Sequence, residues 1–137
     1  MSIDTTFVEH NLDKMWSALV AHRFDQRCVM CGKPGCDSHH WFFPRSYHKY
    51  RWCVNNGVYM CRKDHSKSEL DNGKSLLVII NKYYPRLITW SQERPPEKPE
   101  PVTLDGLMFL EESLSRSVAS LGITIKLEHP KSQARLL

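Results

Sequence analysis

The sequence predicts an α+β protein in which a small, metal-organised centre is flanked by helices. All five cysteines lie between positions 28 and 61, and in a reducing compartment clustered cysteines hold metal more often than they form disulfides. Residues 27–65 show little helical periodicity and are rich in Gly, Cys, His and aromatic side chains. The segments on both sides carry the apolar stripes of amphipathic helices. A length of 137 residues fits one domain with an appendage.

Residues 6–22 are predicted to form the first helix. Their apolar side chains recur at intervals of three and four, as on one face of a helix. They are Val8, Leu12, Met15, Trp16, Leu19 and Val20. Because a stripe of this kind is buried against other elements, we expect residues 1–26 to form an N-terminal unit that packs on the core.

A second helical stretch is predicted after the cysteine-rich centre, over residues 66–84. Pro85 marks its end, since proline cannot continue a helix. The dipeptide Asn72-Gly73 is a turn signal, so the stretch is either one helix or two. The centre and this helical stretch together are expected to form the core unit, residues 27–90.

The C-terminal part of the chain is expected to follow a tether. Residues 91–102 hold four of the eight prolines together with several charges, a composition typical of a semi-rigid linker. The final unit, residues 103–137, is predicted to contain a helix over 103–122 and a short strand over 123–127. One helix and one strand cannot bury their own apolar face. We therefore expect this unit either to dock on the core or to pair with a second copy, with a homodimer through residues 103–127 favoured.

The charge distribution favours a polyanionic partner. The net charge is +4 over the whole chain, but residues 23–67 hold nine basic and three acidic side chains, so this segment is strongly positive. The longest purely apolar run, Leu76–Ile80, is five residues, which is too short to span a bilayer. The first ten residues lack the basic flank and apolar stretch of a secretion signal. We expect a cytoplasmic protein with no membrane partner.

Two cysteines at the start of the centre have the spacing of a zinc knuckle. Cys28 and Cys31 are followed by Gly32, a CxxCG turn in which two thiolates converge on a tetrahedral ion and glycine relieves the backbone strain. Downstream, Cys61 is followed within four residues by an aspartate and a histidine. These groups resemble the second half of such a site.

A histidine pair, an asparagine and a later histidine complete the pattern. His39 and His40 are adjacent, Asn56 lies sixteen residues after His40, and His65 lies nine residues after Asn56. These residue types at these spacings resemble the HNH, or ββα-metal, endonuclease family, and the flanking cysteines resemble its zinc-braced subset. The resemblance covers residues 28–70. It implies a zinc-stabilised, treble-clef-like ββα core with flanking helices.

The resemblance also implies a role for each of these residues. His40 takes the position of the general base, and Asn56, preferred over the asparagine before it, would orient His40 by a hydrogen bond. His39, His65 and Glu69 would hold the catalytic ion, Mg²⁺ or another divalent metal.

Two further sets of residues follow from the same resemblance. Three thiolates would hold a structural Zn²⁺, those of Cys28, Cys31 and Cys61. The fourth zinc donor is left open among Asp64, Cys36 and His65, with Asp64 at the position of the family's last zinc cysteine. Arg45, Lys49 and Arg51 lie in the loop with which the family crosses DNA, and we expect them to contact phosphates. Asp37 is expected to face solvent.

The function implied is hydrolysis of DNA phosphodiester bonds by a metal-dependent endonuclease. Proteins of this size resemble phage or prophage nucleases. The run Ser68–Trp90 is similar to a segment of phage recombination nucleases of the NinG (Rap) type, which implies a role in DNA recombination or processing. Two alternatives are a non-catalytic zinc-containing DNA-binding module and a protein-interaction adaptor.

Overall fold

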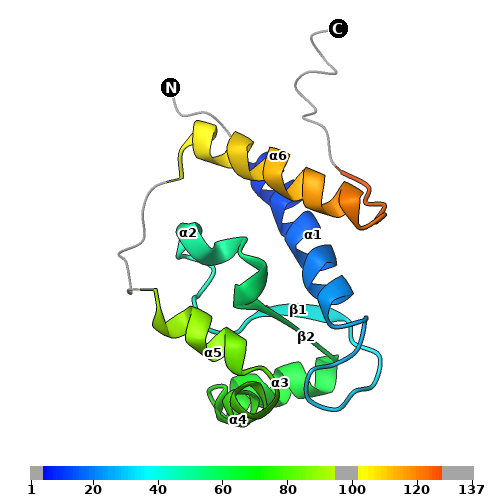
Figure 1. The fold of residues 1–137 in the computed structure, drawn as a ribbon, viewed down its shortest axis with the longest axis vertical. Coiled ribbons are helices and arrows are strands. Elements are labelled where there is room, and N and C mark those ends of the chain that lie inside the picture. The colour runs from blue at the N-terminus through cyan, green and yellow to red at the C-terminus, as the bar shows by residue number, and fades with distance from the viewer. Residues whose placement is uncertain (1–4, 95–101, 128–137) are drawn as a thin grey trace, which may run out of the picture.

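The computed structural model describes residues 5–94 and 102–127, which contain six α-helices around a two-stranded antiparallel sheet (Figure 1). The α+β class expected from the sequence is therefore confirmed. Among the described residues, no helix combines the length and apolarity needed to cross a membrane. The elements are α1 (Thr6–Arg23), β1 (Asp37–His40), α2 (His48–Arg51), a 3₁₀ turn (Val54–Asn56), β2 (Gly57–Met60), α3 (Arg62–Leu70), α4 (Lys74–Tyr83), α5 (Pro85–Gln92) and α6 (Leu104–Ser120).

The sheet has two different faces because strand side chains alternate in direction. β1 and β2 pair with Asp37 opposite Met60 and His40 opposite Gly57. One face lies against α1, where a Cβ atom on Gly57 would come within 2.4 Å of a Val20 methyl carbon. The other face lies against α3, which follows β2 directly. The adjacent histidines that end β1 are thus directed to opposite sides of the sheet.

One hydrophobic core joins the N-terminal helix, the sheet and the later helices. Its least exposed members come from α1, β2, α4 and α6, four elements that are far apart in the sequence. They are Leu12, Met15, Val20, Val58, Met60, Ile80 and Leu107. The stripe predicted for residues 6–22 is buried in this core, as expected.

The helical stretch after the sheet is divided in two. α3 ends at Leu70 and α4 begins at Lys74, and the turn between them places Asn72 and Gly73 at positive φ angles of 55° and 75°. Glycine and asparagine tolerate this left-handed backbone best, so the Asn-Gly signal is the physical cause of the break. Pro85 then occupies the first turn of α5, where its missing N–H costs nothing.

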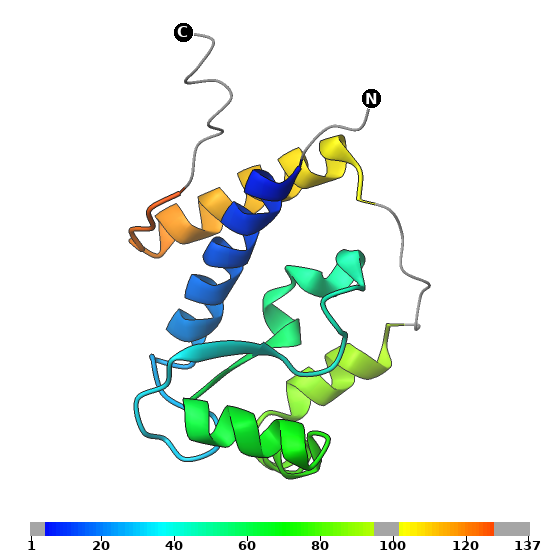
Figure 2. The ribbon, with the colours of Figure 1, turned by 180° about the vertical axis from the view of Figure 1, so that it is seen from behind.

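The C-terminal helix α6 packs on α1 of the same chain. The two helices lie against each other and cross at an angle in both views (Figures 1 and 2). Leu107, Leu114 and Val118 are the α6 side chains buried in this contact. Residues 123–127 form no strand, in contrast to the prediction. Their alternating apolar side chains still pack against the core, but among the described residues no strand lies beside them to pair with. The centre of the expected tether, residues 95–101, lies outside the described residues.

The docking of α6 leads to a stability prediction. Leu107→Ala should lower the free energy of unfolding by about 2–5 kcal/mol, because Leu107 is 1% exposed and its removal leaves a cavity. Met108→Ala is the matched control: this neighbour is 57% exposed and should change the free energy by less than about 0.5 kcal/mol. Urea denaturation of both variants measures the difference. Equal small effects would mean that α6 is not docked in solution.

Candidate metal centres

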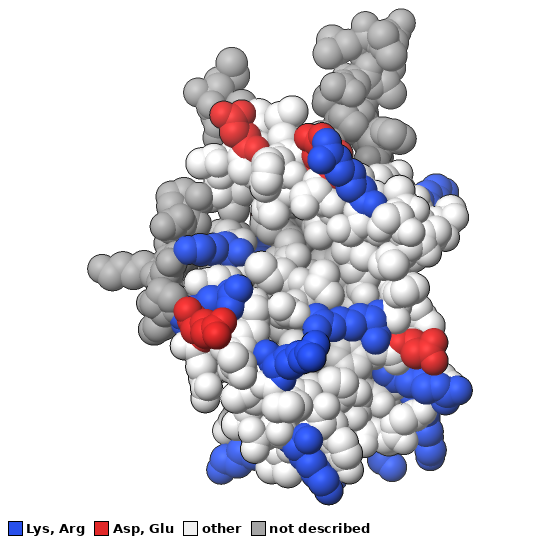
Figure 3. All heavy atoms as spheres, viewed as in Figure 1, with Lys and Arg blue, Asp and Glu red and all other residues white. Residues whose placement is uncertain are grey.

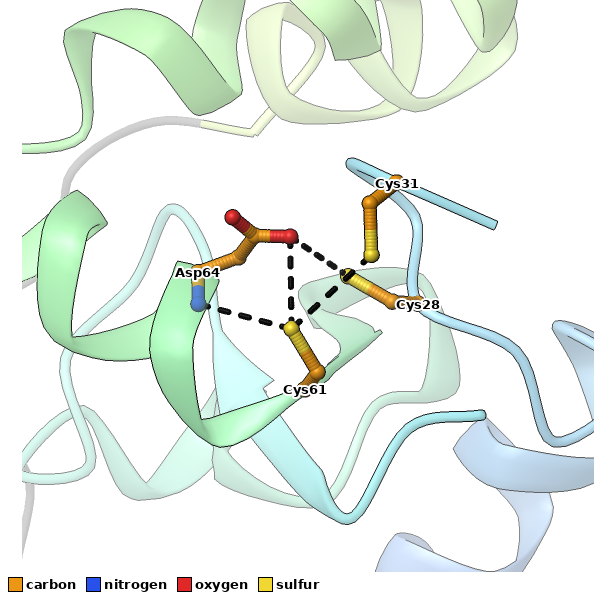
Figure 4. Close-up of side chains that lie close together, drawn as sticks. All are labelled: Cys28, Cys31, Cys61 and Asp64. Atoms are coloured by element: carbon orange, nitrogen blue, oxygen red, sulfur yellow. Dashed lines mark hydrogen bonds between the residues drawn. The ribbon is translucent and has the colours of Figure 1, made fainter. Parts of the chain in front are cut away.

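Four side chains from two distant segments converge into one cluster (Figure 4). They are Cys28, Cys31, Cys61 and Asp64, and their ligand atoms all lie within 4.8 Å of one another. Two come from the turn before β1, and two from the junction between β2 and α3. This is a group that can hold a metal ion such as zinc.

The local sequence explains how each half of the cluster is shaped. In the first half, the Gly32 N–H donates to the Cys28 carbonyl at 2.9 Å, and Gly32 adopts a φ of +74° that closes the turn. The Met30 N–H points at the Cys28 sulfur at 3.4 Å. In the second half, Cys61 is the N-cap of α3, and its sulfur accepts from the Asp64 N–H. Backbone N–H groups thus hold two of the sulfur atoms in place.

The spacing of the cluster fits a tetrahedral zinc ion. With Zn–S bonds of about 2.3 Å and a Zn–O bond of about 2.0 Å, a tetrahedron has S–S edges of about 3.8 Å and S–O edges of about 3.5 Å. The Cys31 and Cys61 sulfurs are 3.9 Å apart, and an Asp64 oxygen lies 3.3 Å from the sulfurs of both Cys28 and Cys61. Such a set needs only small adjustments to surround one ion.

The electrostatics of the cluster also call for a cation. The backbone of Lys33 lowers the pKa of Cys31, but the Asp64 carboxylate, burial and the neighbouring thiols together raise it to about 11. Crowded acidic groups resist ionisation next to one another. A divalent ion reverses this preference, because zinc binds thiolates and carboxylates in their charged forms.

Asp64 is the fourth member of the cluster. Cys36 and His65, the two other donors left open by the sequence, lie outside it. His65 instead contacts two carboxylates, those of Asp37 and Glu69. The zinc-type group and the histidine group are therefore separate sites that share α3.

The second group lies between β1 and α3. The rings of His39 and His65 are 4.7 Å apart, His65 Nδ1 is 3.2 Å from an Asp37 oxygen, and His65 Nε2 is 3.3 Å from a Glu69 oxygen. Each ring nitrogen of His65 thus faces a carboxylate. A neutral imidazole donates from only one nitrogen, so the other contact brings two acceptors together.

Asp37 belongs to this group, contrary to the expectation that it faces solvent. Its carboxylate accepts from Arg62 at 3.1 Å as well as contacting His65. Burial raises the pKa of Asp37, but hydrogen bonds from Arg62 and His65 outweigh it and lower the pKa overall. The signal in the sequence is the period of two along a strand, which places Asp37 and His39 on the same face.

His39 is kept neutral by its surroundings. Burial, followed by the nearby His65 and His40 rings, lowers the pKa of His39 to about 4. A neutral imidazole is the form that binds metal. His39 and Glu69 both lie near His65, but among the described residues only the cysteine group has ligand atoms gathered tightly enough to stand out as a metal site.

His40 lies on the opposite face of β1, against α1. Its ring stacks on the Trp16 ring with centroids 4.1 Å apart and planes 7° from parallel. Its Nε2 is 2.8 Å from the Arg51 carbonyl oxygen. A carbonyl only accepts, so Nε2 carries the hydrogen and Nδ1 carries the lone pair. Burial is the main cause that lowers the pKa of His40 and favours the neutral ring.

Asn56 does not make the expected hydrogen bond to His40. Its side chain is completely buried, and it accepts from the Phe43 N–H at 2.8 Å while donating to the carbonyls of Phe43 and Tyr50 at 2.9 and 3.3 Å. These bonds connect Phe43, in the loop between β1 and α2, to Tyr50 on α2. Asn56 thus holds α2, the helix that ends at Arg51, rather than His40 itself.

The three basic residues expected to contact DNA differ in how exposed they are and in whether an acidic side chain neutralises them. Arg51 lies differently from the expectation: it is 5% exposed, and its guanidinium is paired with Glu9 and Asp13. Arg45 is largely exposed, although one of its nitrogens contacts Asp13 at 3.0 Å. Lys49 is exposed beside the Tyr50 ring. Figure 3 shows one face of the molecule, on which Lys and Arg side chains are spread widely with fewer acidic ones among them.

No family model, no curated protein and no solved structure matches this chain.

The cysteine group leads to a prediction about metal content. The purified chain should hold about one tightly bound zinc ion, and Cys28→Ser or Asp64→Ala should lower both the zinc content and the melting temperature, because a structural metal supplies folding free energy. Elemental analysis and thermal unfolding measure the two effects. Cys53→Ser is the control, since Cys53 lies outside the group. Wild-type zinc content in Cys28→Ser would contradict the assignment.

Proposed function

We propose that this protein is a metal-dependent endonuclease of the HNH (ββα-metal) type that hydrolyses DNA phosphodiester bonds. The observation that carries the proposal is the β1–β2–α3 arrangement, which gathers His39, His65 and Glu69 on one face while His40 ends the same strand. Stability alone does not account for this arrangement. A half-buried histidine pair beside two carboxylates contributes little to a core, but it provides ligands for a divalent ion.

The cysteine group would brace this site. Zinc held by Cys28, Cys31, Cys61 and Asp64 would fix the start of α3 relative to the turn before β1. His65 lies on α3, and His39 lies on β1, the strand that follows this turn. The proposed zinc thus has a structural role, and the proposed catalytic ion is separate and exchangeable.

The residues of the chain would divide the reaction between them. His39, His65 and Glu69 would hold a divalent ion such as Mg²⁺, which when bound stabilises the charge that develops on the phosphate. Asp37 would orient His65 by accepting from Nδ1, which leaves Nε2 for the metal. His40, held through Nε2 by the Arg51 carbonyl, would accept a proton from the attacking water at Nδ1.

DNA would approach along the basic segment. Arg45 on the loop after His40 and Lys49 on α2 are both exposed, so we expect them to contact DNA phosphates. Arg51 is left out of these contacts because its charge is neutralised internally. The family resemblance also supports a phage or prophage origin and a role in DNA recombination or processing.

The test of the proposal is a cleavage assay with plasmid and branched DNA in the presence of Mg²⁺, Mn²⁺ or Ni²⁺. The wild-type chain should cleave, and His40→Ala should lose about 10²- to 10⁴-fold in rate, because the water loses its base. Zinc content and DNA affinity should stay close to wild type. The matched control is His22→Ala, an exposed histidine at the end of α1.

Each result bears on a different hypothesis about the molecule. Wild-type rates in a cleanly purified His40→Ala protein would refute the role of His40. DNA binding without cleavage by any of the metals would refute the nuclease and favour a zinc-containing DNA-binding module.

A separate prediction concerns the DNA path. Arg45→Gln together with Lys49→Gln should weaken binding about equally for different DNA sequences and reduce the slope of log affinity against log salt by about two, since each phosphate contact contributes about one. Arg116→Gln, on the exposed side of α6, is the control and should leave the slope unchanged. Fluorescence anisotropy at several salt concentrations measures this. An unchanged slope in the double variant would move the DNA path elsewhere.

A further inference from the structure

Asp13 on α1 contacts three side chains of the segment 45–52, which runs from the loop after β1 to the end of α2. Its carboxylate accepts from Arg51 Nη2 at 2.8 Å, Arg51 Nε at 3.2 Å, the Trp52 indole N–H at 2.9 Å and Arg45 at 3.0 Å. The donors lie 32 to 39 residues away in the sequence. A single α1 side chain thus holds the segment 45–52 against α1.

Glu9 completes the attachment, one helical turn before Asp13. It pairs with the remaining terminal nitrogen of Arg51 at 2.9 Å. The Arg51 guanidinium also lies 4.6 Å from the centre of the Trp52 ring. Both terminal nitrogens of this guanidinium are paired with carboxylates, and only 6% of the Arg51 side chain is exposed. The group therefore has little freedom to move.

The position of the Arg51 side chain fixes the position of its own backbone. The carbonyl of the same residue accepts the hydrogen bond from His40 Nε2. Glu9 and Asp13 therefore act on the His40 ring through one residue, by holding the acceptor that selects its tautomer.

Trp16 acts on the same ring from α1 directly. It lies three residues after Asp13 and stacks on the His40 face. Its own indole N–H donates to the Cys53 carbonyl at 2.8 Å, so the tryptophan ring is itself held in one orientation. Next to it, the Ser17 hydroxyl bonds to that of Ser38 on β1 at 3.0 Å.

These contacts occupy one side of α1. Glu9, Asp13, Trp16 and Ser17 are spaced four, three and one residues apart, which places them along a single face of a helix. The side chains that meet α6 lie on another face, at Met15 for example. One face of α1 thus serves the core, and the other serves His40 and its loop.

We propose that Asp13 is a positioning residue for His40: through Arg51, together with Glu9 and the stacked Trp16, it holds the His40 ring in the single tautomer that leaves Nδ1 unprotonated. That this tautomer matters for cleavage rests on the proposed function. The assignment of the tautomer rests only on the hydrogen bond from His40 Nε2 to the Arg51 carbonyl. Without Asp13, the Arg51 guanidinium would lose most of its partners, and the end of α2 that carries the carbonyl would shift.

The experiment uses the full-length, zinc-containing chain labelled with ¹⁵N in its histidines. Long-range ¹H–¹⁵N spectra distinguish Nε2–H from Nδ1–H tautomers, and the His40 signals are assigned by their absence from His40→Ala. Wild type should show one tautomer, with hydrogen on Nε2. Asp13→Asn keeps the shape and an acceptor for Trp52 but removes the charge, and it should show two averaged nitrogen shifts, the sign of mixed tautomers.

The kinetic readout should change in parallel. Asp13→Asn should lower kcat by about tenfold or more while leaving KM within about twofold, as is usual for residues that orient a reacting group. The control is Thr103→Ala, which removes the N-cap of α6 and lowers stability far from His40. It should leave the His40 spectrum and kcat at their wild-type values.

The outcomes separate positioning from stability and from the proposed function. Wild-type His40 spectra in both Asp13→Asn and Glu9→Gln would overturn the inference. If Asp13→Asn does not fold, Glu9→Gln decides alone, since this side chain is 24% exposed and its amide conserves the shape. Absence of cleavage by wild type would refute the endonuclease, and the spectra would still decide whether α1 sets the His40 tautomer.

Discussion

Repulsion among crowded acidic groups is the constraint on which the centre of this molecule depends. Three thiols and a carboxylate lie within 4.8 Å of one another, where several negative charges are tolerated only around a cation. The same four side chains connect the turn before β1 to the first turn of α3. The histidines of the candidate catalytic group are carried by β1 and α3, so their separation depends on this connection. A metal ion bound in the cysteine cluster would therefore also fix the separation of His39 and His65.

The part of the fold that the sequence predicts well is the part with local signals. The apolar stripe of residues 6–22, the CxxCG turn and the Asn72-Gly73 break each depend on residues a few positions apart. Metal-ligand patterns allow predictions over longer distances in the sequence, because clustered thiols and imidazoles at short, regular spacings are typical of metal sites. Asp64 could be named as a candidate zinc donor from its position alone, but only the fold separates it from Cys36 and His65.

The parts that the sequence does not predict depend on partners far along the chain. Arg51 resembles any surface arginine until α1 brings Glu9 and Asp13 to it from about 40 residues away. The spacing of Asn56 suggests a contact with His40, but the loop backbone offers this amide three closer hydrogen-bonding groups. The alternation in residues 123–127 indicates which side chains are buried, and it carries no information about whether a neighbouring strand exists.

The contact between α1 and α6 also has a consequence for synthesis of the chain. The two helices are about 100 residues apart in sequence, as the contact between Met15 and Ser115 shows. At about 5–20 residues per second, the ribosome needs roughly 5–20 s to produce the second helix after the first. During that interval the apolar stripe of α1 lacks the cover that α6 provides. The nascent chain is therefore exposed to aggregation and to chaperone binding until α6 has emerged.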